Sequence, residues 1–185
     1  VCCIFDHEGV GSETKQGAAS TFLYDTLTRL CAALGMDGSE YRRLVAGSFL
    51  VSCDNAHAVH PNHSEFADRN HTARMNGGVV IKYNANQRYT SDAVSAGIFR
   101  RICESAGVPV QYYANRADMP GGSTLGNISN TQVSLNAVDI GLAQLAMHSP
   151  FETAGAADTA SLVKALTAFF EHSLVAERDG VYRFL

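Results

Sequence analysis

The stretch Ser52–Pro61 (Ser-Cys-Asp-Asn-Ala-His-Ala-Val-His-Pro) concentrates side chains that could do chemistry. It places one carboxylate, Asp54, and two imidazoles, His57 and His60, within a single short segment. The apolar run 48–53 comes directly before Asp54 and predicts a strand that ends there. Because open α/β sheets bind ligands at the carboxyl ends of their strands, we expect a ligand site at this point.

Two other loops place an acidic or histidine side chain after a predicted strand. Glu8 follows the apolar residues 1–5, and His148 follows the predicted strand 138–141 and its extension. Zinc binds imidazole nitrogen and carboxylate oxygen, and catalytic zinc sites keep one position open for water. The recurrence therefore favours Asp54 and His148 as metal ligands, because both follow apolar strands.

The other candidate residues have simpler alternatives. Glu8 could be a general base that takes the proton of a water attacking a carbonyl, or it could be an exposed turn residue. Spacing alone does not decide between these two. His63, His71 and His172 are better explained as structural or surface imidazoles. The Gly-Gly pair that ends at Gly122 would let the backbone approach a ligand closely, although Pro-Gly-Gly is also an ordinary turn.

Strand-like and helix-like stretches alternate along the chain, which predicts one α/β layered domain over residues 1–185. The polar segment 55–78 carries four histidines and is expected to be a long loop, a kind that is usually functional or interfacial. Apolar periodicity and turn residues locate the other elements. We expect strands at 1–5, 48–53, 79–83, 110–114, 138–141 and in the tail, and helices at 12–35, 40–46, 91–105, after 124, and at 158–172.

Composition indicates an ordinary globular protein and argues against two classes of partner. The 185 residues are 46% hydrophobic and 17% charged, which suits one domain with a substantial core. The formal net charge is −4 and the basic residues are scattered, so no nucleic acid partner is expected. No apolar stretch approaches the length of a membrane span, so no membrane association is expected.

The five cysteines include no Cys-x-x-Cys pair, so neither a zinc knuckle nor a disulfide framework is indicated. Reduced, buried thiols are expected, which is typical of an intracellular protein and predicts a cytoplasmic location. The chain opens on an apolar run without a methionine. We therefore expect a fragment, a processed product, or one half of a larger domain.

Five segments match the motifs of one known family, in order, along nearly the whole chain. They are Phe5-Asp-His-Glu-Gly-Val-Gly-Ser12, Ser52-Cys-Asp-Asn-Ala-His-Ala-Val-His-Pro-Asn62, Val80-Ile-Lys-Tyr-Asn-Ala-Asn-Gln-Arg-Tyr89, Gly122-Ser-Thr-Leu-Gly126 and Val138-Asp-Ile-Gly-Leu-Ala-Gln-Leu-Ala-Met-His-Ser149. In these segments the chain resembles the aspartyl aminopeptidases, which are di-zinc exopeptidases. It is similar to the C-terminal half of such an enzyme.

The resemblance implies a three-layer α-β-α metallopeptidase domain with a central mixed sheet, here incomplete at its N-terminal side. It also implies removal of N-terminal aspartate or glutamate from peptides, two zinc ions per active site, and a tetrahedral dodecamer. Asp54 and His148 would be zinc ligands and Glu8 the general base. The substrate-facing residues implied by the motifs are His57 at the scissile region, Lys82 at the acidic side chain, Tyr89 at the tetrahedral intermediate, and Gly122.

Two departures from the family pattern affect this interpretation. The family motif Asp-x-Glu-Glu has a zinc-ligand glutamate at the position where this chain has Gly9. The family's first histidine ligand and its bridging aspartate would lie before Val1. Of the family's ligands, this chain thus supplies Asp54 and His148, and by itself it should not build a competent di-zinc centre.

Three hypotheses remain open at this point. The first is a zinc aminopeptidase whose missing half is supplied elsewhere. The second is a catalytically silent, assembly-forming relative that serves as an interaction subunit or a transported cargo, and Gly9 motivates it. The third is that Gly9 is an error or an engineered change in a normal enzyme. The presence of His57, Lys82 and Tyr89 places the enzyme first.

Overall fold

The centre of the molecule is a four-stranded mixed sheet. The computed structural model describes residues 1–178 and 180–185. Two strand pairs in the sheet are parallel, β1 with β5 and β3 with β4, and the pair β3 with β5 is antiparallel. The order across the sheet is β1 (Phe49–Cys53), β5 (Asn136–Gly141), β3 (Val79–Tyr83) and β4 (Val110–Ala114).

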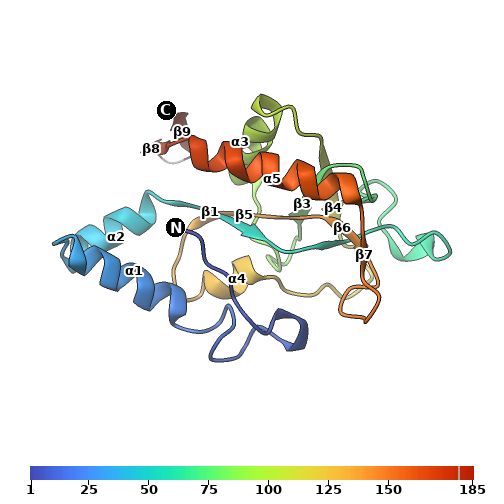
Figure 1. The fold of residues 1–185 in the computed structure, drawn as a ribbon, viewed down its shortest axis with the longest axis horizontal. Helices are drawn as coiled ribbons and strands as arrows, with labels where there is room; N and C mark the ends of the chain where they lie inside the picture. The colour runs from blue at the N-terminus through green and yellow to red at the C-terminus, as the bar shows by residue number, and fades with distance from the viewer. Residues whose placement is uncertain (179) are drawn as a thin grey trace.

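Helices cover both faces of this sheet (Figure 1). Helices α3 (Ala93–Ser105) and α5 (Ala156–Glu171) pack together on one face, and the short α4 (Leu125–Ser129) packs on the other against β1 and β5. Helices α1 (Phe22–Ala33) and α2 (Gly38–Ala46) lie side by side at one end of the molecule. This confirms the predicted α-β-α layering. None of the described helices has the length and apolar composition needed to cross a bilayer.

Short strands form a second, three-stranded sheet. The predicted loop 55–78 is partly ordered, because its first residues form β2 (Ala56–His57), which pairs with β6 (Ala143–Leu145). Strand β6 follows β5 directly and also pairs with β7 (Thr153–Ala154). The remaining elements are the short 3₁₀ turns η1 (Glu8–Val10) and η2 (Ser64–Phe66) and a C-terminal hairpin of β8 (Leu174–Arg178) and β9 (Val181–Phe184).

The main core lies between the sheet and the pair α3 and α5. Strands β3 and β5 are buried on both faces, as their nearly continuous apolar sequences predict. Burying each large apolar side chain contributes about 1.5–3 kcal/mol to stability. The completely buried side chains in this cluster are Val79, Ile81, Phe99, Cys103, Val138, Ile140 and Ala165.

The starts of α1 and α3 differ from their predicted positions for identifiable local reasons, and α2 and α5 each begin two residues earlier than predicted. The first long helix begins at Phe22 and not at Ser12, because residues 12–21 form compact turns. Gly17 lies so close to the Ser12 carbonyl that a Cβ there would be 2.2 Å from its oxygen. Helix α3 is capped by Asp92 in a capping box and not by Ser91, which bonds the backbone of β5 instead.

The predicted strand at residues 1–5 is wrong. These residues pair with no strand in the described part of the chain, and Val1 and Ile4 are 77% and 88% exposed. A strand needs the backbone of a neighbouring strand to satisfy its amide groups. Here the segment lines an apolar groove together with Leu27 and Leu50.

The prediction that the cysteine thiols are buried is correct for only some of the five cysteines. Cys31 and Cys103 are buried, whereas Cys2 and Cys53 are exposed, and all five are free. Cys53 is the last residue of β1, which is an edge strand of the sheet.

We predict that Gly141→Ala lowers the free energy of unfolding by about 1–3 kcal/mol. An added Cβ at Gly141 would lie 1.8 Å from the Asp54 carbonyl oxygen. The end of β5 would therefore have to move away from the backbone that follows β1. Gly97→Ala in α3 is the matched control, because nothing lies within 4 Å of its Cβ position. The control should gain about 0.5–1 kcal/mol from helix propensity. Urea unfolding followed by circular dichroism measures both, and equal stability of the two variants would contradict the prediction.

Candidate active site

A carboxylate and an imidazole that are 140 residues apart in sequence form the outer part of the candidate site. The Nε2 atom of His148 lies 3.0 Å from Oε2 of Glu8. Glu8 begins η1, and His148 lies in the turn after β6 with a φ of 66°. The amide N–H of His148 donates to Oε1 of Glu152 at 2.6 Å, which helps to hold this left-handed turn.

Asp54 occupies the end of β1, as the sequence predicts, and it is held there from two sides. Its amide N–H donates to the Ile140 carbonyl at 3.0 Å, which continues the pairing of β1 with β5. The ammonium of Lys82 donates to the Asp54 carbonyl at 2.9 Å and lies 3.9 Å from the Asp54 carboxylate. The side chain of Lys82 is 1% exposed and that of Asp54 is 16% exposed. Asp54 and Lys82 thus form a buried ion pair beneath the site.

Burial is the main influence on the protonation of this pair. Desolvation raises the pKa of Asp54 above its usual range, the Lys82 charge opposes that rise, and the nearby Glu8 adds to it. Desolvation likewise lowers the pKa of Lys82, against the attraction of Asp54 and Asp139. Since each charged form depends on its partner, removing either side chain would leave an uncompensated buried charge, which typically costs about 3–5 kcal/mol.

Aromatic rings connect Lys82 to His57. The Lys82 ammonium lies 5.1 Å from the centroid of the Tyr89 ring, a cation–π distance. The Tyr89 ring is 6.3 Å from that of Tyr113, which is 6.5 Å from the imidazole of His57. Burial raises the pKa of the Tyr89 hydroxyl, so Tyr89 remains a neutral hydrogen-bond donor at physiological pH. The sequence does not single out Tyr113, because a tyrosine in a strand is usually a packing residue.

His57 and Gly122 border a cleft of about 300 Å³, and Tyr113, Arg116 and Met119 also line it. Gly122 has no protein atom within 4 Å of its Cβ position, so it faces open space. Its neighbour Gly121 is the more confined of the two, with Asn115 3.0 Å from the Cβ position. The structure thus brings the expected substrate-facing residues His57 and Gly122 to one cleft.

The donors present do not complete a metal site. Within the described residues, no group of three or more His, Cys, Asp or Glu side chains is placed to hold a metal ion. Asp54 and His148 have the donor atoms that zinc accepts, but Asp54 pairs with Lys82 and His148 pairs with Glu8. Gly9 lies directly beside the pair of Glu8 and His148, since its Cβ position is 3.9 Å from Cδ2 of His148.

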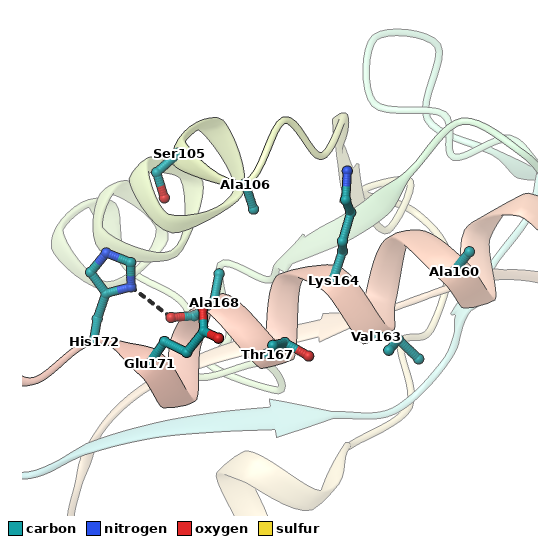
Figure 2. Close-up of a pocket in the computed structure, with 9 residues that line it drawn as sticks. All are labelled: Ser105, Ala106, Ala160, Val163, Lys164, Thr167, Ala168, Glu171 and His172. Carbon is teal, nitrogen blue, oxygen red and sulfur yellow. Dashed lines mark hydrogen bonds between the residues drawn. The ribbon is translucent and has the colours of Figure 1, made fainter.

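Three other histidines, His63, His71 and His172, have the structural contacts expected of them. His63 contacts Glu65 at 3.1 Å and His71 contacts Asp68 at 3.0 Å, both near the surface. Nδ1 of His172 bonds the Ala168 carbonyl at the end of α5 (Figure 2). His172 also lines a hollow of about 700 Å³ between α3 and α5, and no candidate site residue lines that hollow.

The fold and this cluster define an α/β domain with a polar site at the ends of β1, β3 and β6. A family model described as "Aminopeptidase I zinc metalloprotease (M18)" matches residues 1–170. The chain therefore belongs to the M18 aminopeptidase family, as its resemblance to the aspartyl aminopeptidases predicts.

Individual relatives agree with this assignment. The chain is 48% identical to "Probable M18 family aminopeptidase 2" of Pseudomonas paraeruginosa, over 91% of this chain and 38% of the relative. It is 44% identical to "Probable aspartyl aminopeptidase" of Ricinus communis, over 91% of this chain and 34% of the relative. The chain thus spans little more than a third of the length of these two proteins.

Solved structures show the same fold. The cryo-EM structure of the Ape4 and Nbr1 complex has a TM-score of 0.84 at 40% identity, and the match covers 88% of this chain and 31% of that one. The S. cerevisiae mApe1 dodecamer has a TM-score of 0.77 at 28% identity, with 91% and 37% covered. The α-β-α architecture is therefore that of M18 aminopeptidase domains.

We predict that His57 makes stability depend on pH below neutrality. Desolvation, and then the charges of Lys82 and His148, lower the pKa of His57 below 6.5, against the attraction of Asp54. The unfolded chain therefore binds the proton first as pH falls through about 6.5, and the folded state loses stability there. The unfolding midpoint should fall more steeply from pH 7 to pH 5.5 in the wild type than in His57→Gln.

His63→Gln is the control for this measurement, because His63 lies in the same segment with a side chain that is 56% exposed. It should retain the pH dependence of the wild type. If His57→Gln retained the full slope as well, His57 would not be the titrating group.

Proposed function

We propose that this chain carries part of the active site of an M18 aminopeptidase that releases N-terminal aspartate or glutamate from peptides. The observation that carries the proposal is the 3.0 Å contact of Glu8 with His148, supported by the influence of the Glu8 charge on the pKa of Asp54. The name of the Ricinus communis relative, "Probable aspartyl aminopeptidase", supports the acidic preference. Membership of the M18 family supports the peptidase activity.

Zinc is the cofactor that the family's description names. Asp54 and His148 would hold it, together with ligands that this chain does not contain, and we expect two ions per active site. When bound, zinc supplies Lewis-acid polarisation of the scissile carbonyl and makes water more acidic. The lone pairs of Asp54 are available because Lys82 bonds its backbone carbonyl more closely than its carboxylate.

Glu8 is the proposed general base. Its carboxylate faces the site, is 34% exposed, and can accept the proton of the attacking water and pass it to the leaving amine. His57 would contact the scissile region from the cleft that it shares with Gly122. Because its pKa is lowered, His57 is neutral at pH 7 and can donate one hydrogen bond without adding positive charge. Tyr89 would donate its hydroxyl to the oxygen that becomes negative in the tetrahedral intermediate.

Lys82 is the proposed recognition residue for the acidic side chain. Its ammonium has three N–H donors, and two of them point to the carbonyls of Asp54 and Asn55 at 2.9 and 3.4 Å. The same ammonium lies 3.9 Å from the Asp54 carboxylate, so a substrate carboxylate would have to share this charge with Asp54. A compact buried cation suits a carboxylate better than a neutral side chain, since a neutral ligand would not offset its charge.

We further propose that the protein works as a cytoplasmic homo-oligomer. A dodecamer is described for the S. cerevisiae relative mApe1, which shares this fold. A tetrahedral dodecamer is the assembly that we expect. The five free cysteines are in keeping with a reducing compartment.

We predict that Glu8→Gln, in the full-length protein, lowers kcat for an Asp-leading peptide by about 10²–10⁴-fold. The amide retains the size of the side chain and cannot accept the proton, so the zinc content should remain nearly unchanged. Glu13→Gln is the control, because Glu13 is an exposed carboxylate in the same segment. Kinetics and metal analysis of the purified protein measure both effects. Substantial residual turnover in Glu8→Gln would remove Glu8 from the base role.

We predict that Gly9→Glu increases the zinc bound per chain and raises turnover of the same peptide. The φ of Gly9 lies outside the left-handed region and its Cβ position is open except for the His148 ring at 3.9 Å, so a glutamate fits beside the site. Gly9→Gln has the same size without the charge and should gain neither zinc nor activity.

The zinc content and activity of the wild type test the alternative hypothesis of a catalytically silent relative. A wild-type particle that is assembled, metal-free and inactive would favour a catalytically silent relative. Full zinc content in the wild type, with no gain in Gly9→Glu, would show that no ligand is lost at Gly9.

A further inference from the structure

A completely buried carboxylate, Asp139, lies in the middle of β5 and takes no part in the proposed chemistry. It is 0% exposed and stands opposite Ser52 in the parallel pairing of β5 with β1. A carboxylate is costly to bury unless hydrogen bonds satisfy its oxygens. Its partners therefore show what this position holds together.

Both oxygens of Asp139 accept hydrogen bonds from threonines that belong to different loops. Oδ2 accepts from the amide N–H of Thr90 at 2.5 Å and from the Thr90 hydroxyl at 2.8 Å. Oδ1 accepts from the hydroxyl of Thr124 at 2.8 Å. Charged acceptors make these bonds about twice as strong as neutral ones.

Each threonine adjoins a residue of the proposed substrate site. Thr90 directly follows Tyr89, and Thr124 is the N-cap of α4, two residues after Gly122. The two loops also touch at the surface, where Nη1 of Arg88 donates to the Ser123 hydroxyl at 3.1 Å. One carboxylate thus lies beneath both loops and bonds each of them.

The close packing of α4 on this carboxylate depends on Gly126. A Cβ at Gly126 would be 2.7 Å from Oδ1 of Asp139 and 2.9 Å from Cβ of Ser52. Only a residue without a side chain lets α4 come near enough for the Thr124 hydroxyl to reach Asp139. The hydrogen bond from Thr124 to the Asp139 carboxylate therefore positions the start of α4.

We propose that Asp139 is a positioning residue that fixes the Tyr89 loop (residues 84–90) and the Gly122 loop (residues 121–124) relative to each other. The carboxylate joins the loops through Thr90 and Thr124, so that loosening one loop loosens the other. The importance of this coupling for peptide binding rests on the proposed function. The coupling between the two loops does not depend on the proposed function.

The experiment compares Thr90→Val and Thr124→Val in the full-length protein by hydrogen–deuterium exchange. Each valine keeps the size of the side chain and removes one hydroxyl donor to Asp139. Thr90→Val should raise exchange in residues 121–126 as well as in its own loop, and Thr124→Val should raise exchange in residues 84–90. The Thr→Ser variants retain the hydroxyl and should exchange like the wild type.

Two further variants test whether the coupling runs through the buried carboxylate. Thr131→Val removes an exposed hydroxyl that bonds the Ile128 carbonyl, and it should affect neither loop. Arg88→Met removes the surface contact with Ser123 and should leave the coupling between the loops intact. Exchange that rises only in the mutated loop, or coupling that is lost in Arg88→Met, would overturn the proposal.

Kinetics on the same proteins adds a readout that general destabilisation would not give. We expect KM for an Asp-leading peptide to rise about tenfold in each valine variant, and the double variant to show less than the product of the two effects. Strictly multiplicative effects would count against a shared acceptor. If the wild type showed no peptidase activity while the exchange coupling was present, the proposed function would fail and the role of Asp139 would stand.

Discussion

The buried ammonium of Lys82 is the interaction on which the rest of the candidate site depends. It bonds the carbonyls of Asp54 and Asn55 where the chain leaves β1, and it lies beside the Asp54 carboxylate and the Tyr89 ring. A cation at 1% exposure is stable only with such partners, because desolvation works against its charge. The need to satisfy this one charge thus fixes the end of β1 and the Tyr89 loop together.

The order of strands explains why the site is built from distant parts of the chain. Strand β5 lies between β1 and β3, so Asp54 and Lys82 meet across it, and the absent side chain of Gly141 leaves room for the Asp54 carbonyl. Strand β6 continues from β5 and delivers His148 to Glu8. Asp139, one position before the buried Ile140 on the same strand, bonds Thr90 of the Tyr89 loop and Thr124 of the Gly122 loop.

Glu8, Asp54, His57, Lys82 and Tyr89 are all placed together, yet the donors within the described residues do not complete a metal site. Gly9 stands beside His148 at the position where the family resemblance predicts a carboxylate, and the surrounding space would accept one. The space left at Gly9 is therefore open, and only the His148 ring lies within 4 Å of its Cβ position.

The sequence by itself determined the elements whose patterns are local. The apolar runs of β1, β3 and β5 and the periodicity of α3 are correctly predicted, and so are the mixed α/β class, the family and the position of Asp54 at a strand end. The tertiary structure alone decided the pairing of Glu8 with His148, the burial of Lys82 and the contacts of Asp139, because each depends on residues far away in the chain. It also decided that residues 1–5 form no strand, since a strand exists only where a second backbone lies beside it.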